Sequence, residues 1–354
     1  MTHISVIGGG LIGLSTAFRL GLRGHRVVLF DPTPARGATH HAGGMLAPTA
    51  EVVYRQETLF PLMRASAQMY PGLIADVEKH TTFPTGYRTD GTLVVAADRA
   101  DATQVAELAG YQAAHGMAVE RLSVRQARAL EPALHPRLAG AVSIPGDHQV
   151  SPRTLAAALL DALGHLGVDV IREEIHHLPT DGQVVVCNGL DAARLVEGLR
   201  LRPVYGDMLR LRVPEHLNPP LTRVVRGYVE GRPVYVIPRA DRTIAIGATS
   251  REDGRHVPQV AGVHELLRDA IRLVPALEEC DFLGASCGAR PGTPDDLPYL
   301  GRISDRVIVS TGYFRHGILL AALAAQVTVD LIEGNEPAVD LSACLPTRFQ
   351  EHPC

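Results

Sequence analysis

The sequence predicts an α/β fold, α+β overall, in which two domains are interleaved along the chain. Segments that alternate short apolar strands with helices occur at the start, in the middle and at the end of the chain, and β-rich segments lie between them. Such alternation is typical of a parallel sheet covered by helices, whereas runs of strands are typical of an antiparallel sheet. The length of 354 residues, at about 150 residues per domain, agrees with two domains.

The first 31 residues form a predicted strand–helix–strand unit. Ile4–Ile7 is a short apolar run typical of a buried parallel strand. A helix with one buried face follows and ends at Gly24, and a second strand, Arg26–Phe30, closes at Asp31. The loop that comes next, residues 36–48, is rich in Gly and Ala, and we expect no regular element in it.

The remaining elements follow from the spacing of apolar residues. The pattern predicts helices at 59–79, 100–115, 123–130, 151–166, 191–199, 264–277 and 317–332. It predicts strands at 92–96, 141–144, 168–171, 184–186, 204–213, 234–238, 243–247 and 307–310. The strands 234–238 and 243–247 form a predicted hairpin. From this order we assign residues 1–85, 146–202 and 284–345 to one discontinuous domain, and residues 86–145 and 203–283 to the other.

Composition excludes several classes of protein. Hydrophobic residues make up 46% and charged residues 20% of the chain, which is typical of a globular protein and not of a disordered one. The net charge of −4 leaves no basic surplus for binding nucleic acid or an anionic membrane. Lys79 is the only lysine and follows Glu78, so no P-loop is present, and its polar surroundings argue against a pyridoxal-phosphate enzyme.

Cysteine and histidine patterns predict no metal site and no disulfide framework. The five cysteines are odd in number and form no CxxC pair, and no HExxH motif occurs. No apolar run reaches the roughly 18 residues that a membrane span requires. The strand at Ile4–Ile7 begins too early for a secretory peptide. We therefore expect a cytoplasmic protein.

A glycine motif at the first strand–helix junction predicts a dinucleotide site. The motif is Gly8-x-Gly10-x-x-Gly13, and Asp31 stands at the end of the second strand. The glycines allow a tight turn and a close approach of backbone to a pyrophosphate at the helix N-terminus, while the acid accepts hydrogen bonds from an adenosine ribose. The motif alone leaves NAD and FAD open.

Three further segments have the composition of ligand-contacting loops. Residues 38–48 combine small residues with Thr39 and the apolar Met45, which suits contact with a flat ligand. Residues 288–301 are rich in Pro and Gly and carry Arg290, whose planar fork matches a carboxylate. Residues 310–320 form a strand–loop–helix junction whose helix N-terminus would stabilise a reduced, anionic flavin.

Together these segments resemble the D-amino-acid oxidase-type flavoproteins, and among them the glycine oxidases of thiamine biosynthesis. The resemblance covers nearly the whole chain and rests on the segments AGGMLAP, VYVIPRADRTIAIGAT, ARPGTPDDLPYLG and GYFRHGILLA. It implies a Rossmann-like domain that binds FAD noncovalently and an antiparallel-sheet domain that binds substrate. It also implies oxidation of glycine or another small amino acid to an imine by hydride transfer to the flavin, without a side-chain base. Reoxidation by O2 would give H2O2, hydrolysis of the imine would give the oxo acid and ammonia, and the imine would supply the thiamine thiazole. A homo-oligomer, typically a homotetramer, is implied as well.

The resemblance also assigns residues. Substrate would contact Arg290, Tyr235, Arg315 and Met45. The cofactor would contact the fingerprint and three further segments: Gly8, Gly10, Leu11, Ile12, Gly13, Asp31, Thr39, Gly43, Gly44, Met45, Ile175, Tyr313, Phe314, Arg315, His316, Gly317, Ile318 and Leu319.

The sequence departs from the family pattern at four places. Only residues 172–183 connect two strands that a longer hairpin usually joins, so Ile175 is the candidate for the contact near adenine. Ser250 and Pro233 replace commoner pocket residues, and Cys287 is one position away from the cysteine that holds FAD in sarcosine oxidases. We therefore expect no covalent link. A D-amino-acid oxidase, an N-methyl-amino-acid oxidase or a dehydrogenase of the same fold, and a non-catalytic flavin-binding subunit, remain as alternatives.

Overall fold

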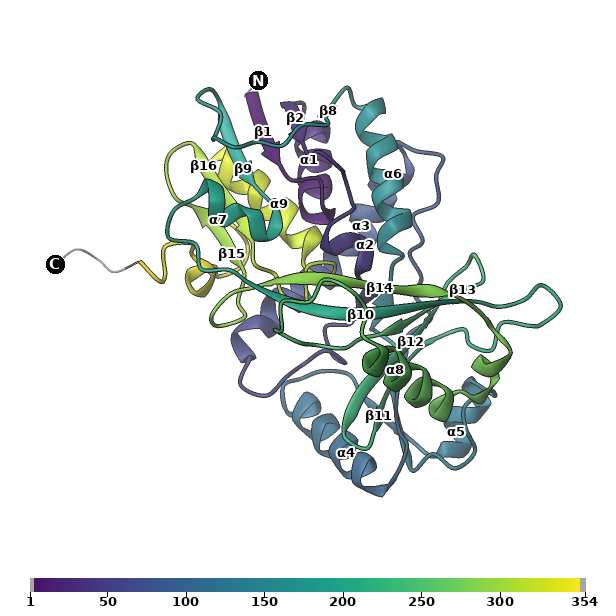
Figure 1. Cartoon of the computed structure of the whole chain (residues 1–354). Coiled ribbons are helices and arrows are strands. Elements are labelled where there is room, and N and C mark those ends of the chain that lie inside the picture. The colour runs from purple at the N-terminus through teal and green to yellow at the C-terminus, as the bar shows by residue number, and fades with distance from the viewer. Residues whose placement is uncertain (1–2, 351–354) are drawn as a thin grey trace.

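A computed structural model describes residues 3–350 of the chain and contains two large sheets (Figure 1). The first sheet has six strands in the order β15-β16-β9-β1-β2-β8. Its strands are β1 (His3–Ile7), β2 (Arg26–Phe30), β8 (Asp169–Ile171), β9 (Gln183–Val186), β15 (Tyr299–Arg302) and β16 (Val307–Thr311). All neighbouring pairs are parallel except β15 with β16. The predicted parallel sheet is therefore confirmed.

Helices cover the six-stranded sheet because its strands and these helices each present an apolar face. The helices are α1 (Leu11–Leu22), α3 (Phe60–Glu78), α6 (Pro152–His165) and α9 (Ala321–Glu333). α1 packs against both α6 and α9, and α3 packs against α9. Val6 and Val185 join the core under these helices, while Ile7 and Val186 belong to the core on the other face. This alternation is what the period of two in a strand requires.

The second sheet has eight strands in the order β14-β10-β13-β12-β11-β4-β6-β5. Its strands are β4 (Thr92–Ala96), β5 (Glu120–Leu122), β6 (Gly140–Ile144), β10 (Arg202–Arg212), β11 (Val224–Val229), β12 (Arg232–Pro238), β13 (Thr243–Gly247) and β14 (Asp281–Gly292). The pairs are antiparallel except β11 with β4. β12 and β13 form the predicted hairpin.

Three helices accompany this sheet: α4 (Arg99–Ala114), α5 (Val124–Leu130) and α8 (Val260–Leu273). Leu93 and Val95 of β4 pack in one core with α8, and Val94 and Ala96 pack in another with α4. Figure 1 shows the two sheets in different halves of the molecule, with the long strands β10 and β14 running across between them. The minor elements are α2 (Ala38–His41), α7 (Ala192–Leu195), β3 (Met45–Leu46), β7 (His148–Gln149) and the 3-10 turns Glu57–Leu59, Gly189–Asp191, Pro275–Glu279 and Ser342–Cys344.

Several predicted elements differ from the structure. The Gly/Ala-rich loop contains α2 and the short strand β3, which pairs with β7. The helix predicted at 191–199 is reduced to a 3-10 turn and the four residues of α7. The helix predicted at 317–332 begins only at Ala321, because residues 317–320 form a turn. The helix predicted at 264–277 is α8, which ends before Pro275, a residue that lacks the N–H a helix needs.

The strands β5, β7, β11, β14 and β15 have no counterpart among the predicted strands. Most of the segment 288–301 was expected to be irregular because of its prolines, yet residues 288–292 continue β14. β14 lies at the edge of its sheet, where a proline removes no ladder hydrogen bond. β14 also crosses the domain boundary that we place between residues 283 and 284, and its whole length belongs to the eight-stranded sheet.

No helix within residues 3–350 combines the length and apolar character that crossing a membrane requires.

Candidate active site

A cavity of about 490 Å³ is lined by residues of both sheets. At the six-stranded sheet it meets the carboxyl ends of parallel strands, at Ile7, Asp31, Cys187 and Thr311. At the eight-stranded sheet it meets β10, β11, β12 and β14. Ligands of open α/β sheets bind in the crevice at this end of the strands. The volume is within the range of small-molecule and cofactor sites.

The glycine motif has the geometry of a dinucleotide turn. Gly8 has a φ of +106°, and a Cβ there would lie 2.6 Å from the backbone of Asn188. A Cβ on Gly13 would lie 1.8 Å from the carbonyl oxygen of Gly8, so only glycine lets α1 approach β1 this closely. The first turn of α1 holds no acidic residue, and Gly10 offers no capping side chain. This helix terminus therefore keeps its positive partial charge for an anion.

Asp31 and Thr39 fix the loops beside that terminus. The Asp31 carboxylate accepts hydrogen bonds from the N–H groups of Gly9 (2.6 Å) and Thr33 (2.7 Å). The Thr39 hydroxyl accepts one from the Leu11 N–H at 2.9 Å. Asp31, Thr39 and Leu11 all line the cavity, so the strand end, the helix start and α2 meet at one place.

Three arginines hold the loop that follows α2, and the sequence analysis did not identify them. Arg153 and Arg210 each donate to the carbonyl oxygen of His40 at 2.9 Å. Arg239 donates to the Gly43 carbonyl and, at 2.9 Å, to that of Val150. The cationic side chains thus bind the free carbonyls at the end of a short helix. Each arginine is at least 89 residues from its partners in the sequence, so no local pattern could reveal them.

The held loop comes close to Tyr235. A Cβ on Gly43 would lie 3.0 Å from the Tyr235 ring, and Gly44 has a φ of +82°. The Tyr235 hydroxyl contacts the sulfur of Met208 at 3.1 Å. Burial raises the pKa of the phenol, against the opposing positive charges of Arg290 and Arg315. Tyr235 and Met45 both line the cavity.

Arg290 reaches the cavity from β14. Its guanidinium lies across Gly206 of β10, where a Cβ would be only 2.5 Å away. It donates to the carbonyl oxygen of Thr249 at 3.3 Å. Burial lowers the pKa of the Arg290 guanidinium, but an arginine remains charged at neutral pH. The predicted carboxylate-binding residues Arg290 and Tyr235 are thus brought together in one cavity.

A buried acid, Glu51, joins two further arginines at this end of the cavity. Arg226 donates to one carboxylate oxygen of Glu51, and Arg315 lies 3.7 Å from the other. Glu51 and Arg226 are 8% and 6% exposed, so their charges depend on each other. Both line the cavity, and neither was predicted. Because the two residues are 175 positions apart, no local sequence pattern indicates that they form a pair.

The segment after β16 forms another wall. Tyr313, Phe314, Arg315, Gly317 and Ile318 line the cavity. The N–H of Phe314 donates to the carbonyl of Pro291 at 2.9 Å, which ties this segment to β14.

Three predicted cofactor contacts, Gly13, His316 and Leu319, are not among the lining residues. Gly13 acts through the packing of α1. Burial and the charge of Arg315 lower the pKa of His316 to about 3, which keeps it neutral. The Leu319 carbonyl accepts from Ser66 at 2.6 Å.

The departures from the family pattern also have defined places. Ile175, in the short connection between β8 and β9, lines the cavity. Pro233 of β12 and Ser250, which follows β13, line it as well. Cys287 does not line it; its sulfur accepts from Arg251 at 3.2 Å. Among the cysteines that the structure describes, Cys187 alone lines the cavity, and burial raises the pKa of its thiol to about 12. Residues 3–350 contain no group of three or more His, Cys, Asp or Glu placed to hold a metal ion.

Comparison with known proteins identifies the family. The model of the FAD dependent oxidoreductase family (DAO) matches residues 3–331. The chain belongs to this family. It is 33% identical to the glycine oxidase of Geobacillus kaustophilus over 98% of both chains. It is 34% identical to the bifunctional protein ThiO/ThiG of Trichormus variabilis over 98% of this chain and 55% of that protein. The crystal structure of the Geobacillus kaustophilus glycine oxidase matches with a TM-score of 0.88 and 31% identity, over 98% of this chain and 99% of that one.

The residues of the cavity fit the FAD of this family. Gly8, Gly10 and Gly44 line the cavity, so backbone without side chains faces it there. The first turn of α1 holds no acidic residue that would repel a phosphate. The predicted fold, family and cofactor are therefore confirmed.

Proposed function

We propose that the protein is an FAD-dependent oxidase of glycine and other small amino acids. The family gives the oxidoreductase class, and the name of the Geobacillus kaustophilus relative, glycine oxidase, suggests the substrate. The observation that carries the substrate class is the pair Arg290 and Tyr235 in the cavity that begins at the glycine motif. A guanidinium and a phenol together bind a carboxylate through charge-assisted hydrogen bonds.

The other side chains of this site favour an amine without a proton. The positive charges of Arg226, Arg290 and Arg315 all act on Tyr235, and Glu51 is the acid that pairs with Arg226 and Arg315. Nearby positive charges disfavour an ammonium ion and lower its pKa. A neutral amine can lose its α-hydrogen as hydride without a side-chain base. Bound FAD would supply the acceptor for this hydride, and its reoxidation by O2 would give H2O2.

The biological role follows from the same relatives. The name ThiO/ThiG of the Trichormus variabilis relative suggests a role in thiamine biosynthesis, where the imine would supply the thiazole. We include in the proposal a cytoplasmic location and a homo-oligomer, which the family resemblance implies. We also include the two domains. Residues 1–85, 146–202 and 284–345 would bind FAD, and residues 86–145 and 203–283 would bind substrate, with β14 shared across the boundary.

The decisive experiment mixes the purified protein with glycine, sarcosine or D-alanine and measures both H2O2 and the reduction of an artificial electron acceptor. We expect H2O2 with glycine. Acceptor reduction without H2O2 would indicate a dehydrogenase, and a preference for sarcosine or D-alanine would favour the corresponding oxidase. A flavin that none of these substrates reduces would contradict the proposal and favour a non-catalytic subunit.

The noncovalent cofactor is tested on the same preparation. Acid precipitation should leave FAD in the supernatant, because Cys287 points away from the cavity and Cys187 is buried as a thiol. Flavin retained by the precipitated protein would contradict a noncovalent site.

A further inference from the structure

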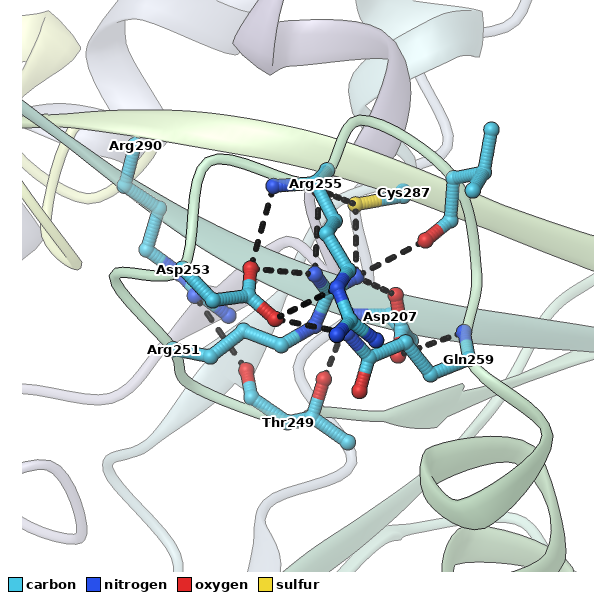
Figure 2. A network of polar contacts seen from close by, with 9 residues as sticks. Asp207, Thr249, Arg251, Asp253, Arg255, Gln259, Cys287 and Arg290 are labelled. Atoms are coloured by element: carbon cyan, nitrogen blue, oxygen red, sulfur yellow. Dashed lines mark hydrogen bonds and ion pairs between the residues drawn. The ribbon is translucent and has the colours of Figure 1, made fainter.

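A loop beyond β13, residues 248–259, forms one side of the cavity, and the side chain of Arg251 within it makes five hydrogen bonds. Ala248, Thr249 and Ser250 line the cavity. The next residue, Arg251, pairs through its backbone with Tyr205 of β10, at 2.8 and 3.0 Å. Its side chain then meets Asp207 and Cys287, as Figure 2 shows. These two residues are paired on β10 and β14 next to Gly206 and Gly288, which line the cavity, so they face the opposite side of the sheet.

The Arg251 guanidinium organises this loop. It donates to the carboxylates of Asp207 (2.7 Å) and Asp253 (2.9 Å). It also donates to the carbonyls of Arg255 (3.0 Å) and Val257 (2.9 Å) and to the sulfur of Cys287 (3.2 Å). The Asp207 side chain is fully buried and that of Arg251 is 13% exposed, so this is a desolvated ion pair. Removing either partner would leave an uncompensated charge.

The same pair connects to the carboxylate-binding residue through Thr249. The Asp207 N–H donates to the Thr249 hydroxyl at 2.8 Å, and the Thr249 carbonyl accepts from Arg290 at 3.3 Å. Asp207 also neighbours Gly206, over which the Arg290 guanidinium lies. Arg290 is therefore supported by the loop on one side and by β10 on the other, and Asp207 belongs to both supports (Figure 2).

We propose that Arg251 and Asp207 are positioning residues that hold Thr249, and through it the guanidinium of Arg290, in the orientation that binds the substrate carboxylate. This inference rests on the proposed function, because it assumes that Arg290 receives the carboxylate. It assigns no chemical step to either residue. It predicts a defect in carboxylate binding, measured as KM for glycine and as the dissociation constant of acetate, while turnover at saturation is kept.

The experiment compares Arg251→Ala and Arg251→Lys in the FAD-loaded enzyme. Arg251→Ala should raise both KM for glycine and the acetate dissociation constant by about tenfold, since a small misplacement of a binding group has a large effect. kcat and bound FAD should stay within about threefold of wild type. Arg251→Lys should recover part of the loss, because lysine can pair with Asp207 but cannot reach all the loop carbonyls. Val257→Ala, which shortens an exposed apolar side chain of the same loop, is the control and should match wild type.

A second pair of variants keeps the test valid if Arg251→Ala does not fold. Thr249→Val removes the hydroxyl that accepts from Asp207 at nearly constant shape, and Thr249→Ser retains it. KM and the acetate dissociation constant should be higher in the valine variant than in the serine variant. Equal constants in the two, or an Arg251→Ala enzyme whose KM stays within twofold of wild type, would overturn the inference.

A merely structural role would show in two results together. Arg251→Ala would lose FAD and kcat in the same proportion as its KM rises, and the two Thr249 variants would not differ. Full activity of Arg290→Ala would instead refute the site assignment itself, so the two failures are distinguishable.

Discussion

Glu51 and Arg226 show how a single residue acts in this site. Each is nearly buried, and each supplies the charge that the other needs. Arg226 also stands opposite Tyr235 across the strands β11 and β12. The pair therefore supports the phenol that we assign to the substrate, and Glu51 extends that support to Arg315.

Glu51→Gln should destabilise the protein, because it leaves Arg226 buried without a counter-charge. Removal of one partner from a buried ion pair costs about 3–5 kcal/mol. Denaturant unfolding of the variant measures this free energy. Glu107→Gln is the control, since Glu107 is exposed on α4, and it should change stability by less than about 0.5 kcal/mol. Equal stabilities of the two variants would refute the role of the pair.

At the scale of elements, the start of α1 determines whether the cofactor end of the cavity forms. Gly13→Ala places a methyl group 1.8 Å from the Gly8 carbonyl oxygen, so α1 has to move away from β1. We expect purified Gly13→Ala to retain less FAD than wild type. Gly164→Ala is the matched control, because a Cβ at this position in α6 meets nothing within 4 Å. It should keep full FAD and gain up to about 1 kcal/mol of stability from helix propensity. Equal FAD content in both variants would contradict the packing argument.

The turn between β6 and β7 predicts a dependence of stability on pH. Asp147 is fully buried and accepts from the N–H groups of Thr49 (3.1 Å) and Ala50 (2.6 Å). Burial raises its pKa to about 7, against these hydrogen bonds. Between about pH 4 and 7 the folded protein therefore keeps a proton that the unfolded chain releases, so this contribution to stability is present at low pH and is lost as the pH rises through 7.

Asp147→Asn removes that titration. The melting temperature of wild type minus that of the variant should fall as the pH rises from 4 to 8. Taking this difference cancels the contribution of His316, whose lowered pKa acts in the opposite direction over part of the same range. A difference that is constant with pH, or that increases, would contradict a raised pKa for Asp147.

Local patterns predicted the elements whose signals lie within a few residues. The β1–α1–β2 unit, the hairpin of β12 and β13, and α6 behind Pro152 are examples. The prediction failed where tertiary position decided the outcome. β14 tolerates its proline because it is an edge strand. α9 begins only at Ala321 because residues 317–320 form a turn, in which Gly317 and Ile318 line the cavity. In the site, Arg290, Tyr235 and Asp31 were predictable from motifs. Glu51, Arg226 and the arginines that hold residues 40–43 were not, because their partners are distant in sequence.

At the scale of the whole molecule, the cavity joins two sheets with different tasks. The six-stranded sheet presents the helix terminus and the strand ends that fit the cofactor. The eight-stranded sheet presents Arg290 on β14 and Tyr235 on β12, and both side chains line the cavity. Because β10 and β14 run between the two halves, Arg290, to which we assign the substrate carboxylate, lies on the strand pair that connects them (Figure 1).

The most direct test of this account is H2O2 production by wild type, Arg290→Ala and Arg290→Lys on glycine, sarcosine and D-alanine. Arg290→Ala should keep its flavin spectrum but lose about 2–5 kcal/mol of transition-state stabilisation, measured as kcat/KM, because a buried carboxylate would lack its partner. Lysine should rescue poorly, since a point charge lacks the bidentate fork. Kinetics of Arg290→Ala within twofold of wild type on all three substrates would contradict the carboxylate site and the proposed glycine oxidation with it.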